Sequence, residues 1–129
     1  MKGLSAALAL ALLATPAAQA AEITQVMTQR LPNAPGTRMT VITVAYKPGE
    51  ASLPHRHAAS GFLYARVLTG RIRSQVHGQG PARVYGPGEG WTEGPDAHHL
   101  VSENASATDP ASILVVFVAD DGAVLTRPE

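Results

Sequence analysis

Residues 53–70 read LPHRHAASGFLYARVLTG and hold two of the chain's five histidines, His55 and His57, directly behind a proline. Successive side chains of a β-strand point to opposite faces, so residues i and i+2 project together. If this segment is extended, both imidazoles share one face, and neutral imidazoles at that spacing suit adjacent positions on one metal ion. On this pattern alone, two unengaged histidines in an exposed loop are the alternative.

Around this segment the chain consists of short runs rich in β-branched and aromatic residues, separated by glycine and proline. Many short strands with frequent turns are typical of an all-β sandwich or barrel. We expect residues 71–76 to form a hairpin with 61–68 across Thr69-Gly70, and the continuously apolar run 113–119 to be a strand buried on both faces. The expected strands are 22–29, 38–46, 61–68, 71–76, 82–85, 90–93, 98–103 and 113–119.

The first twenty residues have the order of a secretory signal peptide: a basic Lys2, an apolar stretch at 4–13, and small residues ending at Ala20. The apolar stretch is shorter than the roughly 20 residues that span a bilayer. We therefore expect cleavage after Ala20, a periplasmic or secreted mature protein, and one domain at residues 21–129. An uncleaved N-terminal anchor is the alternative.

The composition excludes several classes of function. Ten basic and ten acidic residues give no net charge, so neither nucleic acid nor an acidic membrane is expected as a partner. The absence of cysteine excludes disulfides, thiol catalysis and thiolate metal sites. An exported chain of this kind depends on packing, with a bound metal as one further source of stability.

A second segment, GEGWTEGPDAHHLVSEN at residues 88–104, completes a pattern that resembles the paired motifs of the cupin superfamily. The first family motif reads G-x5-H-x-H-x3-4-E-x6-G, and here Gly49 precedes His55 and His57 while Gly70 closes the run. The second reads G-x5-P-x-G-x2-H-x3-N. It begins at Gly88 and places His99 on the family's histidine.

This resemblance implies a single cupin β-barrel of the jelly-roll type, with His55, His57 and His99 converging on one point inside it. Three neutral imidazoles form a ligand set for a divalent transition metal, and zinc, manganese, iron, nickel and copper all fit such a set.

The main departure from the family is the glutamate of the first motif, because Leu63 stands seven places before Gly70 and no acidic residue lies nearby. Glu93, just before the turn that leads to His99, is a candidate substitute. The other interpretation of Glu93 is a solvated residue at a strand end, since carboxylates are seldom buried unpaired. The second motif departs too, with Asp96 where glycine is usual and Asn104 one place late.

Strand parity separates the remaining polar residues from this site. His98 is adjacent to His99 and so must face the other way unless a bulge intervenes. His77 lies in a turn and is expected to be solvated. If residues 63, 65 and 67 face inward, Tyr64 and Arg66 face outward, toward a second subunit.

The resemblance therefore predicts an exported metal-binding cupin that acts on a small molecule, for instance as a metal-dependent dioxygenase. The alternative is a non-catalytic module that binds a small ligand, because the sequence offers no residue that can be assigned as catalytic. We also expect a homodimer, in which the N-terminal strand at 21–29 is free to extend a neighbour's sheet.

Overall fold

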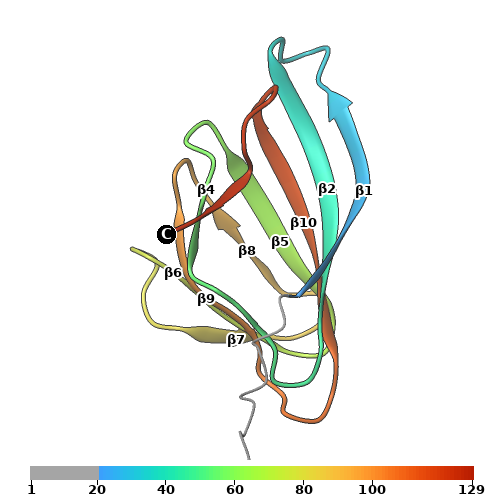
Figure 1. Cartoon of the computed structure of the whole chain (residues 1–129), viewed down its shortest axis with the longest axis vertical. Coiled ribbons are helices and arrows are strands. Elements are labelled where there is room, and N and C mark those ends of the chain that lie inside the picture. The colour runs from blue at the N-terminus through green and yellow to red at the C-terminus, as the bar shows by residue number, and fades with distance from the viewer. Residues whose placement is uncertain (1–20) are drawn as a thin grey trace, which may run out of the picture.

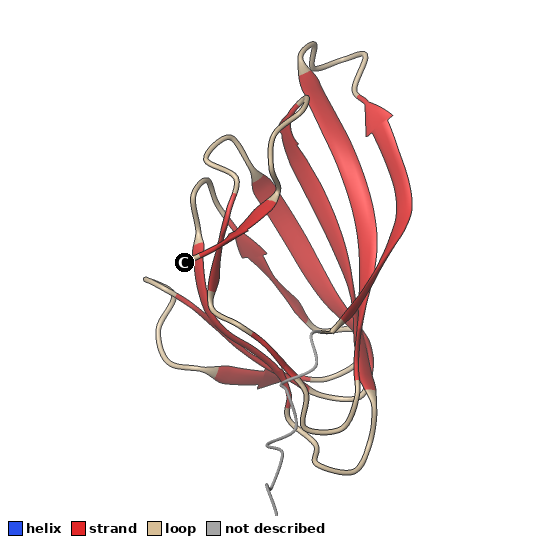
Figure 2. Ribbon diagram, in the orientation of Figure 1, coloured by secondary structure: helices blue, strands red, loops and turns tan. Residues whose placement is uncertain are grey.

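The computed structural model describes residues 21–129, which form β-strands joined by turns and no helix. The expected signal peptide at residues 1–20 lies outside the described residues. Within residues 21–129 there is accordingly no helical segment with the length and hydropathy of a membrane span. The strands build two antiparallel sheets that face each other, as in a jelly-roll barrel (Figures 1 and 2). The expected all-β fold is confirmed.

One sheet is five-stranded, in the order β1-β2-β10-β5-β8. These strands are β1 (Glu22–Arg30), β2 (Thr37–Tyr46), β10 (Ala111–Asp120), β5 (Phe62–Thr69) and β8 (Gly90–Glu93). The facing sheet has the order β11-β4-β9-β6-β7, with β3 paired to β9. Its strands are β11 (Thr126–Pro128), β4 (His55–His57), β9 (His98–Asn104), β6 (Ile72–Val76), β7 (Arg83–Tyr85) and β3 (Ala51–Ser52).

The core lies between the sheets and follows the period of two that strands impose. In β5, the side chains of Leu63, Ala65 and Val67 are buried while their neighbours are exposed, which confirms the expected parity. In β10, alternate residues are buried but those between them are only half-buried. The expectation that 113–119 is buried on both faces is therefore wrong, because no layer of the described chain covers the outer face of this sheet.

The predicted hairpin between residues 61–68 and 71–76 is also wrong. Both edges of β5 are already occupied, by β10 and β8, so the turn at Gly70 carries the chain across to the facing sheet. There β6 pairs with β7 and β9. Gly70 has φ 71°, and a Cβ on it would lie 2.4 Å from the carbonyl oxygen of Pro110. The position requires glycine both for its conformation and for this close approach.

The N-terminal strand does not stand free, as the sequence suggested, but pairs with β2 along its length. Every residue of β1 is exposed, because β1 is an edge strand whose other side has no partner among residues 21–129. Its apolar side chains include Ile23 and Val26. Among residues 21–129, the free side of β1 is therefore an open sheet edge.

Candidate metal centre

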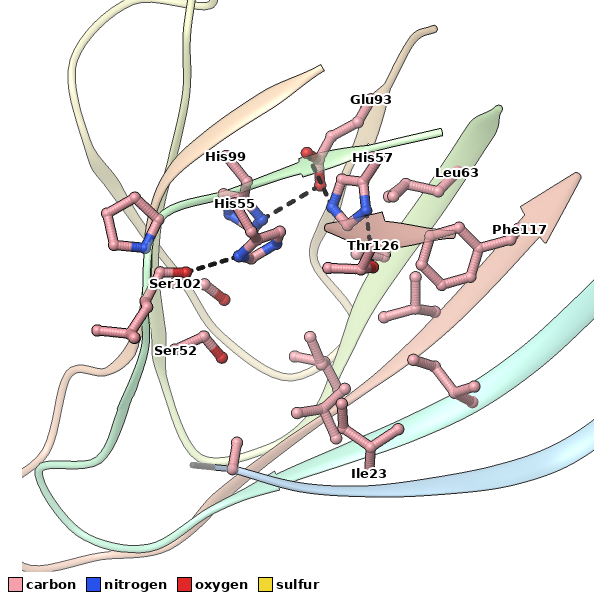
Figure 3. Close-up of a pocket in the computed structure, with 18 of the residues that line it drawn as sticks. Ile23, Ser52, His55, His57, Leu63, Glu93, His99, Ser102, Phe117 and Thr126 are labelled. Carbon is pink, nitrogen blue, oxygen red and sulfur yellow. Dashed lines mark hydrogen bonds and ion pairs between the residues drawn. The ribbon is translucent and has the colours of Figure 1, made fainter. Parts of the chain in front are cut away.

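Three imidazoles converge between the sheets. His55 and His57 lie on β4, and His99 lies opposite His55 on the paired strand β9. The ring centroids are 4.8 Å apart for His55 and His57, and 5.0 Å apart for His55 and His99. One ring nitrogen of each residue lies within 4.8 Å of the others (Figure 3). The three histidines named from the sequence are therefore brought together, as the i, i+2 spacing and the second motif require.

Two of the rings are oriented by hydrogen bonds through Nδ1. The Nδ1 of His55 lies 2.7 Å from the carbonyl oxygen of Leu53, and that of His57 lies 3.1 Å from the carbonyl oxygen of Leu125. A carbonyl oxygen only accepts, so Nδ1 carries the hydrogen in both rings, and in the neutral form of each ring Nε2 is the nitrogen with the lone pair. Metal-binding histidines are commonly fixed in this way.

The third ring is held from the other side. Ser74 on β6 places its hydroxyl 2.8 Å from Nε2 of His99. The Nδ1 of His99 lies 3.5 Å from a carboxylate oxygen of Glu93. Because a hydroxyl can donate or accept, Ser74 suits either tautomer of this ring.

Glu93 is buried within the site, with 2% of its surface exposed. The interpretation of Glu93 as a solvated strand-end residue is wrong, because it occupies the inner face of β8 with Trp91. The indole of Trp91 donates a hydrogen bond to Oε2 at 3.2 Å. The other oxygen, Oε1, is buried, makes no hydrogen bond, and lies 3.5 Å from Nε2 of His57. A buried carboxylate oxygen without a donor is costly and calls for a partner such as a cation.

Glu93 also lies beside the position where the first motif has its glutamate. In the ladder between β5 and β8, Leu63 is paired directly with Glu93. The side chains of such a pair lie on the same face, with Cβ atoms about 5 Å apart. The carboxylate thus comes from the strand beside the one that carries it in the family motif.

Burial sets the protonation of the site. It raises the pKa of Glu93 to about 7, partly offset by the hydrogen bond from Trp91. Burial, reinforced by the nearby His55, lowers the pKa of His57 to about 4 and that of His99 to about 3. Both histidines are therefore neutral at physiological pH and need lose no proton to become ligands.

The other two histidines lie outside this cluster. His98 faces away from the site and forms an ion pair with Glu129. His77 is exposed, with its ring 6.3 Å from that of His98. A bulge does occur in β9, but it follows His99: Val76 pairs with His99 while Gln75 pairs with Val101. The alternation between His98 and His99 is intact, as expected.

The same bulge explains a departure from the second motif. One extra residue between His99 and Val101 shifts the strand, so Asn104, one place late in sequence, faces inward and is buried. Asp96, where the family has glycine, has φ 55°, a conformation that glycine adopts without strain. Asp96 forms an ion pair with Arg127 in the C-terminal strand.

The imidazoles and Glu93 line one wall of a cavity of about 360 Å³. The remaining walls are mostly apolar and include Ile23, Leu63 and Phe117 (Figure 3). Volumes of roughly 300–1,000 Å³ with few polar groups are typical of small-molecule sites.

Comparison with known proteins agrees with this arrangement. Residues 42–117, more than half of the chain, match the family model described as the cupin domain. The chain belongs to the cupin family. No curated protein matches the chain.

Several solved structures share this cupin's fold. A protein with a double-stranded β-helix domain from Klebsiella pneumoniae is 20% identical with TM-score 0.63, and the match covers 88% of this chain and 90% of that one. The protein TT1209 from Thermus thermophilus is 23% identical with TM-score 0.60, covering 78% and 84%. The DMSP lyase DddQ from Ruegeria pomeroyi is 17% identical with TM-score 0.65, and the match covers 84% of this chain but 51% of the lyase. At these identities the likeness establishes the fold alone.

The partners that orient the rings escaped sequence reasoning. The carbonyl groups of Leu53 and Leu125 leave no signal in a sequence, because every residue has one. Ser74 sits at an inward position of a predicted strand, and a polar residue there is a signal that could have been followed. The strand β11, which brings Leu125 and Thr126 to His57, is too short to be recognised from its pattern.

Proposed function

We propose that this protein is an exported metal-binding cupin that acts as a small-molecule enzyme, such as a metal-dependent dioxygenase. The observation that carries the metal proposal is the buried Oε1 of Glu93, which has no hydrogen-bond donor and faces Nε2 of His57. A divalent cation among the imidazoles would give this oxygen the partner that the protein itself does not provide.

His55, His57 and His99 would hold the ion, with Glu93 as the fourth ligand. Three imidazoles and one carboxylate reduce the charge of a divalent ion to a single positive charge. They also match the ligand preferences of first-row transition metals. When bound, the ion supplies Lewis acidity and a position where a small ligand is oriented. The chain's own residues contribute the fixed rings, the apolar walls and the exclusion of water.

The alternative function, a non-catalytic module for a small ligand, is favoured by one observation. Glu93 is the sole carboxylate that lines the cavity in the described part of the chain. If Glu93 is consumed as a metal ligand, no second acidic group stands ready to transfer a proton. Binding of a ligand on the ion would then be the whole function of the site.

Metal analysis tests the proposal. Protein purified from the exported fraction without a chelating column is expected to contain one transition metal ion per chain. The variant His99→Ala is expected to lose this metal. His98→Ala is the matched control and is expected to retain it, because His98 faces away. Retention in His99→Ala with loss in His98→Ala would contradict the assignment of the ligands.

Turnover separates the two functions. Oxygen consumption by the metal-loaded protein with small phenols or keto acids is expected for an oxygenase. Tight binding of such compounds without turnover would instead support the binding module.

Export and self-association are also part of the proposal. Mass spectrometry of the exported protein is expected to show an N-terminus at Ala21, whereas an intact Met1 would favour the anchored alternative. A homodimer is supported by the open edge of β1 and by the exposed apolar residues on the outer face of the five-stranded sheet, such as Phe62 and Tyr64.

A further inference from the structure

The cavity contains a second polar group, made of hydroxyls. The phenol oxygen of Tyr46 lies 2.8 Å from the hydroxyl of Ser102 and 3.1 Å from that of Ser52. Tyr46 and Ser102 are buried, and all three residues line the cavity. Ser52 and Ser102 point into the cavity on the other side of the His55 ring from Glu93 (Figure 3). We refer to Tyr46, Ser52 and Ser102 as the hydroxyl cluster.

The hydroxyl cluster has more donors than its internal contacts use. Three hydroxyl groups bring three hydrogens, and the two contacts among them consume two. Burial raises the pKa of Tyr46, so its phenol keeps the hydrogen at physiological pH. One hydrogen of the cluster is therefore left for an acceptor in the cavity, where an unsatisfied donor would be costly.

The cavity also limits the charge of its ligand. None of the residues that line it within the described part of the chain is a lysine or an arginine. Apart from the metal ion of the proposed function, nothing there can compensate a negative charge. Leaving a charge unpaired against the apolar walls is unfavourable.

On the basis of the proposed function, we propose that the cavity selects small monoanions with an apolar body, bound at two points. The anionic group lies on the metal, and a neutral acceptor oxygen, such as an ether or ketone, accepts a hydrogen bond from the hydroxyl cluster. Dianions, with a second carboxylate, are excluded.

The single tryptophan, Trp91, contacts Glu93 at the site and lines the cavity, so its fluorescence reports binding. Zinc-loaded protein is titrated with the three positional isomers of methoxybenzoate. Each is compared with the benzoate that carries an ethyl group at the same ring position, which has the same shape but no ether oxygen. At least one methoxy isomer is expected to bind about three- to tenfold more tightly than its ethyl counterpart, the range of one net hydrogen bond. Phthalate is expected to bind more weakly than benzoate.

A triple variant locates the effect. Tyr46→Phe combined with Ser52→Ala and Ser102→Ala removes every hydroxyl of the cluster, and it is expected to lose the preference for the ether while retaining zinc. Tyr64→Phe, a tyrosine on the outer face, is the matched control and is expected to keep it. A preference that survives in the triple variant would overturn the inference. Ethyl isomers that bind as tightly as their methoxy counterparts in every case, or phthalate that binds more tightly than benzoate, would overturn it as well.

A second experiment, on protein without metal, distinguishes failure of this inference from failure of the proposed function. In protein without metal, anisole is expected to bind more tightly than ethylbenzene, because the hydroxyl cluster acts without the ion. Failure to load zinc with this preference present would reject the metal site and retain the cluster as a hydrogen-bond donor to the oxygen of the ligand. Equal binding of anisole and ethylbenzene to the unaltered protein would reject the cluster, whether or not zinc binds.

Discussion

In the metal-free protein, Glu93 is the group of the site that still holds a proton near neutral pH, whereas His57 and His99 have lost theirs. Burial causes both effects, because it disfavours the charged form of each group. The residues of one site are thus prepared for a cation in different ways. His57 and His99 present lone pairs without losing a proton, and the carboxyl group of Glu93 must release a proton as the ion enters.

This difference predicts how metal affinity depends on pH. With the pKa of Glu93 raised to about 7, the carboxyl group is protonated below that pH, and a metal must displace the proton. Affinity is therefore expected to increase as the pH rises through 7 and to level off above it. Calorimetry of zinc binding in buffers of different ionisation enthalpy is expected to show release of about one proton at pH 6 and little at pH 8.5.

Glu93→Gln is expected to remove this proton release and to lower metal affinity by at least about tenfold, since the amide cannot provide a negative ligand. Glu89→Gln, which changes an exposed carboxylate, is the control and is expected to leave both unchanged. Proton release of equal size in Glu93→Gln would show that the proton comes from a histidine.

Among the elements, β11 is a strand of only three residues that acts on the site. It pairs with β4 so that Thr126 lies opposite His57, and Leu125 and Thr126 both contact Nδ1 of that ring. Arg127 joins β11 to the turn before His99 through Asp96. All of β11 is exposed, so it adds little to the core while orienting a ligand.

Truncation after Leu125 is therefore expected to weaken metal binding by about ten- to a hundredfold, the usual effect of losing groups that orient a ligand. The thermal midpoint of the metal-free protein is expected to change little. Truncation after Pro128 removes only Glu129 and serves as the control. Competition with a chelating dye measures the affinities, and equal values for both truncations would contradict a positioning role for β11.

The turn between β5 and β6 offers a prediction on stability. Gly70→Ala places a Cβ 2.4 Å from the Pro110 carbonyl oxygen in addition to imposing a left-handed conformation on alanine. Gly78→Ala imposes the same conformation, with φ 84°, but its Cβ meets nothing within 4 Å. Urea unfolding is expected to show a loss of about 1–2 kcal/mol for Gly78→Ala and about 1–3 kcal/mol more for Gly70→Ala. Equal losses of stability in the two variants would mean that the backbone around Pro110 can move away from the added Cβ without a measurable free-energy penalty.

The sequence predicted best the features that follow from the two-residue alternation of side chains within a strand. It identified the long strands, the inward parity of Leu63 and the shared face of His55 and His57, because these follow from alternation and from spacing. The resemblance to the cupin motifs added His99. Sequence reasoning failed where the outcome depends on partners distant in sequence. The turn at Gly70 resembles a hairpin locally, and only the occupation of both edges of β5 sends the chain to the other sheet. The burial of Glu93 likewise depends on the sheet that encloses β8.

For the molecule as a whole, the outer face of the five-stranded sheet carries exposed apolar side chains that the site does not use. Phe62, on this face, is 51% exposed, and the alternate residues of β10 beside it are only half-buried. Light scattering at high concentration is expected to give the mass of a dimer. Phe62→Glu is expected to give a monomer if this face forms the contact, and Val26→Lys if the β1 edge does. A monomer for the unaltered protein at every concentration would contradict the dimer.

Because Leu63 and Glu93 are paired across the ladder, a carboxylate at either position reaches the same point of the site. Its separation in sequence from the paired histidines is therefore not fixed. Two residues that face each other across a ladder can exchange roles, although 30 positions separate them in the chain. The double exchange Leu63→Glu with Glu93→Leu would therefore restore the family's usual order of ligands and is expected to retain metal, whereas Glu93→Leu alone is not. Sequence searches that require a carboxylate a fixed number of residues after the paired histidines would overlook chains of this kind. In such chains the carboxylate should be sought at the residue that pairs with this position on the neighbouring strand.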